Sequence, residues 1–309
     1  MSLFDLSPTA NPPPNPPAPS PAVVTVQRLE KSFAKREVLR ALDWSVPAGR
    51  VIGLLGRNGA GKTTLLRCLL GLSPIDGGEI SLFGAPMTEP GGERMHRIGF
   101  VPQTFDLFPW MKVRAYLDFT AAFYARWNTS LADRLLGDWQ LDPKQKIGQL
   151  SQGQRQKLAI VRAIAPEPDL LVLDEPVASL DPQARRAFMA ELLELMRGPD
   201  KTVIFSTHIT ADLERAEADI ALLRDGRIQF TRPLAELRAR LRRVVFTRES
   251  GWPQAPVVAG LLKATVKDAR VELLVEDPVQ PSLEALAVRE GATVQVETPT
   301  LEDLFVELA

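Results

Sequence analysis

The residues best suited to chemistry lie in one glycine-rich stretch between residues 56 and 63. Its glycines allow consecutive backbone N–H groups to turn toward a phosphate chain, and the dipole of a following helix favours the same anion. Lys62 adds a positive charge for the β- and γ-phosphates, and Thr63 offers a hydroxyl group to Mg²⁺. The spacing therefore predicts a phosphate-binding loop made of Gly56, Arg57, Asn58, Gly59, Ala60, Gly61, Lys62 and Thr63.

A second group of polar residues follows apolar runs that read as strands. Residues 170–173 form a continuous apolar run that ends in Asp174 and Glu175. Asp174 can hold the water shell of Mg²⁺, and Glu175 can accept a proton from water that attacks the γ-phosphate. Gln103 and His208 each follow another strand-like run, and His208 can donate to the γ-phosphate. An acid pair after a strand is often only a loop cap, but its occurrence with the phosphate loop favours catalysis.

Two weaker signals complete the candidate site. Ser151 is a suitable N-cap for a helix expected to run to about residue 165, and Gly153 follows it closely, so the helix start presents a phosphate-facing surface. Phe33 lies among polar residues, which is an unusual position for an exposed ring. Its alternative is packing in a core or at a sheet edge.

The elements that must position these residues alternate between strand and helix. Residues 51–55 read as the strand before the loop, and residues 64–72 read as the helix after it. The alternating pattern from residue 23 to residue 46 predicts an antiparallel β-subdomain, and helical spacing from 104 to about 165 predicts a helical insert. We therefore expect an α/β fold with a parallel-sheet core.

The two ends of the chain differ from this core. Residues 1–22 are rich in proline, so we expect a disordered tail, and they lack the basic and apolar segments of a secretory signal. Residues 233–309 predict a linker helix and a small α+β domain, in which Thr300 and Asp303 form a capping box. Leu234, Leu237 and Leu241 fall on one stripe of the linker helix. Six arginines lie between residues 227 and 243, and they predict a solvated helix face, with anionic lipid headgroups as the alternative contact.

Composition excludes several classes of protein. A net charge of −1 gives no electrostatic reason to expect a nucleic-acid partner, and no apolar run approaches the roughly 18 residues of a membrane span. Cys68 is the only cysteine in the 309 residues, which excludes a disulfide framework and indicates a reduced, cytoplasmic setting. Because no apolar run is long enough to span a membrane, any membrane role must depend on a partner protein.

Together these motifs resemble those of the ATP-binding cassette (ABC) family, over roughly residues 23–232. They occur in the order of that family, and the pentapeptide at residues 150–154 is their specific part, although Gln152 stands where the commonest pattern has glycine. The resemblance implies a P-loop NTPase of ABC type that hydrolyses ATP with Mg²⁺. Glu175 would polarise the attacking water while His208 fixes the γ-phosphate, so catalysis is mostly positioning and charge stabilisation.

The same resemblance assigns the remaining contacts. Phe33 would stack on adenine, and Gln103 would act both in catalysis and on the metal. The implied nucleotide contacts are Phe33, the loop at 56–63, Thr64, Ser151, Gly153 and Gln154, and the implied magnesium contacts are Thr63, Gln103 and, through water, Asp174.

The resemblance also implies an assembly. In this family the signature pentapeptide completes the site of the opposite subunit, which implies a head-to-tail homodimer or heterodimer with ATP between the chains. The leading interpretation is the ATPase subunit of an exporter, held at the inner face of the cell membrane by a separate permease. The ending at 298–305 is similar to the C-terminal tails of export-type subunits, and the aromatic stretch at 105–110 is either tucked under the insert or a docking patch.

Two other functions compete with transport. A soluble ABC ATPase acting on ribosomes or DNA is disfavoured because the chain has one cassette, no long coiled coil between Gln103 and Ser151, and no large basic extension. A catalytically silent regulator is disfavoured because Glu175 and His208 are both present.

Overall fold

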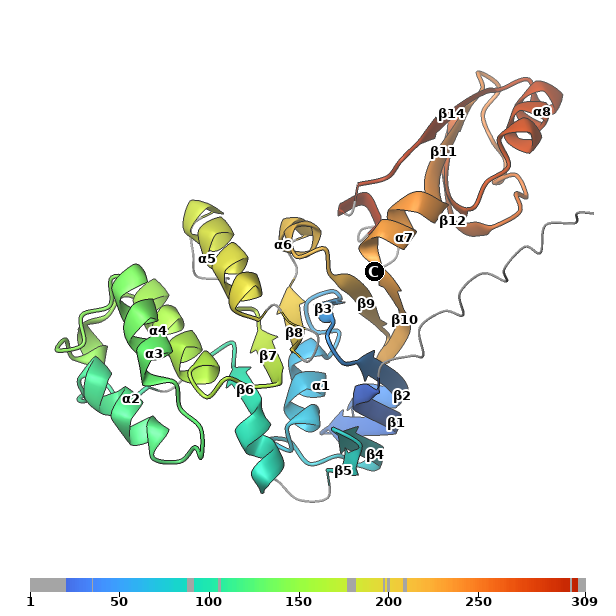
Figure 1. Ribbon diagram of the computed structural model, residues 1–309. Helices are drawn as coiled ribbons and strands as arrows, with labels where there is room; N and C mark the ends of the chain where they lie inside the picture. The colour runs from blue at the N-terminus through green and yellow to red at the C-terminus, as the bar shows by residue number, and fades with distance from the viewer. Residues whose placement is uncertain are drawn as a thin grey trace, which may run out of the picture.

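Three sheets organise the part of the chain that the structure describes (Figure 1). The structure is a computed structural model that describes residues 21–34, 36–87, 92–104, 107–176, 182–196, 198, 201–207, 210–300 and 302–304. Most of the expected proline-rich tail, residues 1–20, lies outside this range.

The central sheet has the strand order β10-β9-β3-β8-β7-β6. Five strands run parallel, and β10 pairs with β9 in the antiparallel sense. β7 and β8 are buried along their whole length, and the sequence of β7 accordingly reads as a nearly continuous apolar run, whereas β8 carries hydroxyl residues at both ends. The strands are β3 (Val51–Leu55), β6 (Ile98–Val101), β7 (Leu170–Asp174), β8 (Thr202–Thr207), β9 (Asp219–Arg224) and β10 (Arg227–Pro233).

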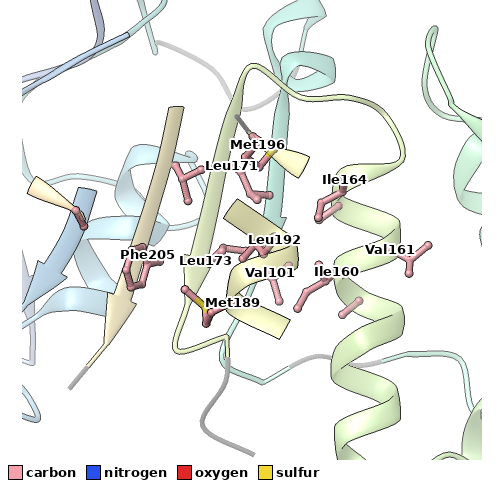
Figure 2. Packing of buried hydrophobic residues seen from close by; sticks show 14 of the residues in the cluster. Val101, Ile160, Val161, Ile164, Leu171, Leu173, Met189, Leu192, Met196 and Phe205 are labelled. Carbon is pink, nitrogen blue, oxygen red and sulfur yellow. The ribbon is translucent and has the colours of Figure 1, made fainter. Parts of the chain in front are cut away.

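Each face of the central sheet packs against different elements. One face meets α1 (Lys62–Leu69) and the antiparallel sheet, where Leu65 and Leu66 share a buried cluster with Ile52. The other face meets α4 (Gln152–Ile164), α5 (Pro182–Leu195) and α6 (Thr210–Arg215). Figure 2 shows Leu171 and Leu173 of β7 between these helices and Phe205 of β8. This two-sided burial holds the carboxyl ends of the strands in fixed positions.

The other two predicted parts of the cassette are present. The antiparallel sheet has the order β2-β1-β4-β5, which confirms the β-subdomain, and the helical insert lies to the other side of the central sheet in Figure 1. The sheet contains β1 (Ala22–Phe33), β2 (Arg36–Pro47), β4 (Gly77–Leu82) and β5 (Ala85–Pro86), and the insert contains α2 (Val113–Ala121), α3 (Thr129–Asp138) and α4.

The C-terminal region forms the third sheet, with the order β12-β13-β11-β14. Its separate core places Val244, Phe246 and Leu273 against Leu283 of α8. The elements are β11 (Leu241–Thr247), β12 (Leu261–Lys267), β13 (Arg270–Glu276), α8 (Gln280–Glu290) and β14 (Thr293–Glu297). The predicted capping box is confirmed, because the Asp303 N–H donates to Thr300 Oγ1 at 3.1 Å and the Thr300 N–H donates to Asp303 Oδ2 at 3.1 Å.

The linker helix α7 (Leu234–Arg240) ends one residue before Leu241, so the expected helical stripe is too long. Leu241 opens β11, because the β-branched and aromatic residues that follow it pair with β13. Arg242 and Arg243 consequently lie on a strand. No helix among the described residues has the length and apolar character needed to cross a bilayer.

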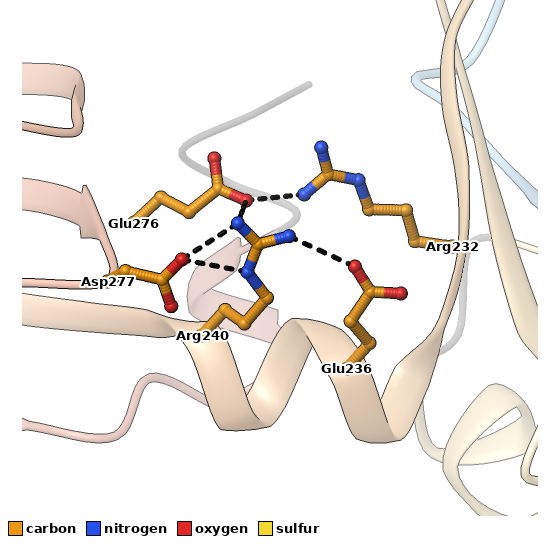
Figure 3. A network of polar contacts seen from close by, with 5 residues as sticks. All are labelled: Arg232, Glu236, Arg240, Glu276 and Asp277. Atoms are coloured by element: carbon orange, nitrogen blue, oxygen red, sulfur yellow. Dashed lines mark hydrogen bonds and ion pairs between the residues drawn. The ribbon is translucent and has the colours of Figure 1, made fainter. Parts of the chain in front are cut away.

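Arginines of α7 and of β10 form ion pairs with acidic residues at the end of β13. Arg240 donates to Asp277 at 2.7 Å, and it also pairs with Glu236 and with Glu276, each at 3.2 Å (Figure 3). Arg232 of β10 reaches the same Glu276, so the central sheet and the third sheet share one ion-pair network. These arginines therefore link two parts of the chain as well as facing water.

Candidate active site

The carboxyl ends of three central strands open into one cavity of about 970 Å³. Residues 57–64 line it after β3, Gln103 lines it after β6, and Glu175 lines it after β7. Phe33, Val38 and residues 223–226 also line it. The structure thus brings together the groups that the sequence placed at three separate strand ends.

The loop backbone is shaped to hold an anion. Gly59 has φ of 81° and Gly61 has φ of 105°, which are left-handed conformations that side chains disfavour. Gly61 is also the N-cap of α1, which has no side-chain cap and no acidic residue in its first turn. The N–H groups of that turn therefore lack a side-chain acceptor and suit a phosphate group.

Lys62 lies against the floor of the loop with 6% of its surface exposed. Its ammonium group donates to the carbonyl oxygens of Gly56 at 2.7 Å and Arg57 at 3.3 Å. Burial lowers the pKa of Lys62, while the negative charges of Glu175 and Asp174 act in the opposite direction. Gly56 does not line the cavity, but a Cβ atom there would lie 2.6 Å from the Leu223 carbonyl oxygen, so the position requires glycine.

The two acids are held by a serine on the neighbouring strand. Ser206 Oγ donates to Asp174 Oδ1 at 2.6 Å and accepts the Glu175 N–H at 2.9 Å. Gln103 Nε2 lies 3.5 Å from Glu175 Oε2. Asp174 is buried beneath the cavity, and Glu175 reaches into it. No sequence motif pointed to Ser206, although a serine near the end of a buried strand, close to His208 in the sequence, was a signal that could have revealed it.

The signature pentapeptide lies away from this cavity. Ser151 caps α4 as predicted, because its Oγ accepts the Gln154 N–H at 3.2 Å while its own N–H donates to Gln154 Oε1 at 2.9 Å. Ser151, Gly153 and Gln154 are all described, yet none of them lines the cavity. A single chain therefore does not bring its signature to its own phosphate loop.

Phe33 lines the cavity with 51% of its surface exposed, so the alternative of packing in a core is wrong. Lys31 Nζ lies 5.1 Å from the ring centroid. His208 lies outside the described residues, and β8 ends at Thr207.

A glycine-rich loop after one parallel strand, facing an acid pair after another, defines a P-loop nucleotide hydrolase. Comparison with known proteins agrees. Residues 39–178 match the family model described as ABC transporter. A Nod factor export ATP-binding protein I of Burkholderia lata is 34% identical over 298 residues, covering 93% of this chain and 97% of that protein. The protein of the same name from Burkholderia orbicola is 38% identical over 213 residues, covering 67% of this chain and 70% of that protein.

Solved structures show the same likeness. The ATP-binding subunit of an ABC transporter has a TM-score of 0.62 and 28% identity, covering 70% of this chain and 92% of that chain. A dimeric, post-hydrolysis structure of the cassette MJ0796 bound to ADP and Pi has a TM-score of 0.61 and 25% identity, covering 68% of this chain and 98% of that chain. The chain belongs to the ABC transporter family, as an ATP-binding subunit of the export type, and it is an ATPase.

Proposed function

We propose that the cavity at residues 57–64 binds ATP and that Glu175 drives its hydrolysis. The observation that supports this most is the meeting of Lys62, Gln103 and Glu175 in one cavity although they come from three different strand ends. The first turn of α1 would hold the phosphate chain, and Phe33 would stack on the base. Glu175 would accept the proton of the attacking water, while Lys62 balances the charge that develops on the phosphates.

We further propose that Thr63, Gln103 and Asp174 hold Mg²⁺ together with the phosphates. No group of three His, Cys, Asp or Glu residues is close enough to hold a metal within the described ranges. A donor set of one carboxylate, one hydroxyl and one amide instead fits Mg²⁺, which keeps several water ligands and shares phosphate oxygens. When bound, the ion would neutralise phosphate charge and orient the leaving group.

The position of the signature supports a head-to-tail dimer. Because Ser151 and Gly153 do not line the cavity of their own chain, we propose that they cover the nucleotide bound by a second chain. Two copies of this chain would then form two complete sites, and a related subunit could replace one copy. The MJ0796 cassette, whose solved structure is dimeric, is consistent with this arrangement.

We propose that a membrane permease docks on an aromatic groove of the helical insert and so holds the ATPase at the inner face of the membrane. The groove has a volume of about 440 Å³, and Phe108, Phe119 and Phe123 line it with Arg162. Trp110 lies beside Phe108, with ring centroids 5.4 Å apart, and is 69% exposed. The stretch at 105–110 directly follows Gln103 in the sequence. This proximity would link the binding of the permease to the presence of a phosphate group in the cavity.

Docking can be tested by replacing Phe108 and Trp110 with alanine. ATP turnover of the purified subunit should persist while transport in the assembled exporter is lost. Val288 of α8 is 83% exposed, so Val288→Ala provides a control that should keep both activities. Unfolding of the double variant would show that the aromatic residues are structural.

The relatives are named for Nod factor export, and we propose export without a particular substrate, since the permease would select it. Residues 23–232 would form the ATPase domain and residues 233–309 an added domain with its own core.

The direct test compares Glu175→Gln with the wild type. The variant should bind ATP normally but turn over orders of magnitude more slowly, because an amide cannot accept the proton. It should also become dimeric when sized with Mg-ATP, since ATP would stay trapped between the chains. Wild-type turnover would remove Glu175 from its role, whereas a slow variant that stays monomeric with ATP bound would argue against the dimer alone.

A further inference from the structure

We infer that Ser206 is a positioning residue for hydrolysis: its hydroxyl group sets the metal-binding and water-activating acids relative to each other before nucleotide binds. The inference rests on the roles proposed above for Asp174 and Glu175. It assigns to β8 a task in catalysis that is separate from sheet formation.

The parallel register places Ser206 directly beside Asp174. The hydroxyl hydrogen is used in the bond to Asp174 Oδ1 at 2.6 Å, and an oxygen lone pair accepts the Glu175 N–H at 2.9 Å. Ser206 has no exposed surface, so bulk water does not compete for either bond. One hydroxyl group therefore connects two consecutive acids at the end of β7.

Both bonds act on features that catalysis needs. With Oδ1 held by Ser206, the carboxylate of Asp174 has a fixed orientation and keeps Oδ2 for the water shell of the metal. Glu175 has φ of 47°, a left-handed conformation that is unfavourable for a residue with a side chain. The bond from its N–H group to Ser206 stabilises this conformation, which turns the chain at the strand end where Glu175 enters the cavity.

A purely structural serine would make a different pattern. A buried hydroxyl group always needs a partner, and a carbonyl oxygen of its own sheet would satisfy it. Thr202, at the other end of β8, makes a contact that involves neither acid: it is fully buried, and its Oγ1 accepts the Gly49 N–H at 3.1 Å. Thr202→Ala therefore removes a buried hydroxyl bond from the same strand without touching the acids.

The test compares Ser206→Ala with Thr202→Ala in the full-length protein. Loss of a hydrogen bond to a buried carboxylate should lower turnover by about 10- to 100-fold in Ser206→Ala, with metal-free ATP binding within about twofold of wild type. In a Glu175→Gln background, which avoids hydrolysis, the gain in ATP affinity on adding Mg²⁺ should shrink. In the nucleotide-free protein, amide hydrogen exchange at Glu175 should become faster.

Thr202→Ala should lose a similar amount of thermal stability and keep wild-type values for all of these measurements. Ser206→Cys preserves the volume but replaces the hydroxyl with a thiol that hydrogen-bonds weakly, so it should repeat the Ser206→Ala result if the alanine variant folds poorly.

The inference is overturned if Ser206→Ala keeps the turnover, the Mg²⁺-dependent affinity and the slow exchange of the wild type. It is equally overturned if Thr202→Ala shows the same losses, since the effect would then be general to β8. If Glu175→Gln alone turns over normally, both the proposed function and this inference fail. If Glu175→Gln is inactive while Ser206→Ala is normal, only the inference about Ser206 fails.

Discussion

Replacing Lys62 with methionine should separate ATP binding from stability. Methionine keeps the apolar stem of the buried side chain and removes the ammonium group, which donates to two loop carbonyls. A hydrogen bond to a charged partner contributes about 1.5–3 kcal/mol, so ATP affinity should fall about 10- to 150-fold. Turnover at saturating ATP should fall as well, because the same charge faces the transition state.

The stability of the nucleotide-free variant should behave differently. Burial lowers the pKa of Lys62, which means that the folded protein disfavours the charge despite Glu175 and Asp174. Removing the charge relieves this cost and offsets the loss of the two carbonyl bonds, so the free energy of unfolding should stay within about 1 kcal/mol of wild type or rise.

The pH dependence has a defined sign. In the unfolded chain Lys62 loses its proton near pH 10.5, whereas in the folded protein it loses the proton at a lower pH. The unfolded state then binds more protons, so wild-type stability should rise relative to the variant across this alkaline window, while wild-type ATP affinity falls.

Calorimetric titration with ATP and urea unfolding measure these effects. Lys201 offers the matched control, because its ammonium group also donates to two carbonyl oxygens, at 2.9 and 2.7 Å, but lies away from the cavity lining. Lys201→Met should leave ATP affinity unchanged. A Lys62→Met protein that binds ATP like the wild type, or that loses several kcal/mol of stability, would refute the reasoning.

Three further predictions concern other parts of the chain. Phe33→Ala should weaken ATP binding about 5- to 100-fold without lowering the melting temperature, because the half-exposed ring would stack on the base and does not belong to the core; unchanged affinity in a nucleotide titration would contradict this. Arg240→Ala removes the pairs with Asp277, Glu236 and Glu276 and should lower the urea midpoint of unfolding slightly while ATP turnover stays normal. Arg243 lowers the pKa of Glu272, so the stability advantage of wild type over Glu272→Gln should be present above about pH 4.3 and disappear as the pH falls through the lowered pKa; a gap that persists in acid would exclude this cause.

Local patterns predicted much of the site because each motif carries its own physical reason. The loop at 56–63 needs glycine conformations and a following helix, and both are readable in consecutive residues. The same holds for Asp174 and Glu175 at the end of a doubly buried strand, and for the cap at Ser151.

Features that depend on distant segments were not predictable in this way. Ser206 meets the acids only through the register of β7 and β8, and residues 223–226 form a cavity wall only through the strand order of the central sheet. The predicted end of the linker helix was wrong, because pairing with β13 overrides the helical spacing of Leu241. His208 stays a prediction, since it lies outside the residues that the structure describes.

The most direct test of the composite site mixes two inactive chains. Ser151→Arg would block the signature, and Lys62→Met would disable the phosphate loop, so each variant alone should lack activity. In a mixed head-to-tail dimer, Lys62 of one chain and Ser151 of the other would still form one intact site. If equal amounts of the two variants mix at random, half of the dimers contain one chain of each kind. Each of these mixed dimers has one complete site out of two, so about a quarter of wild-type turnover should return. A mixture no more active than its separate components would contradict a site shared between two copies of this chain.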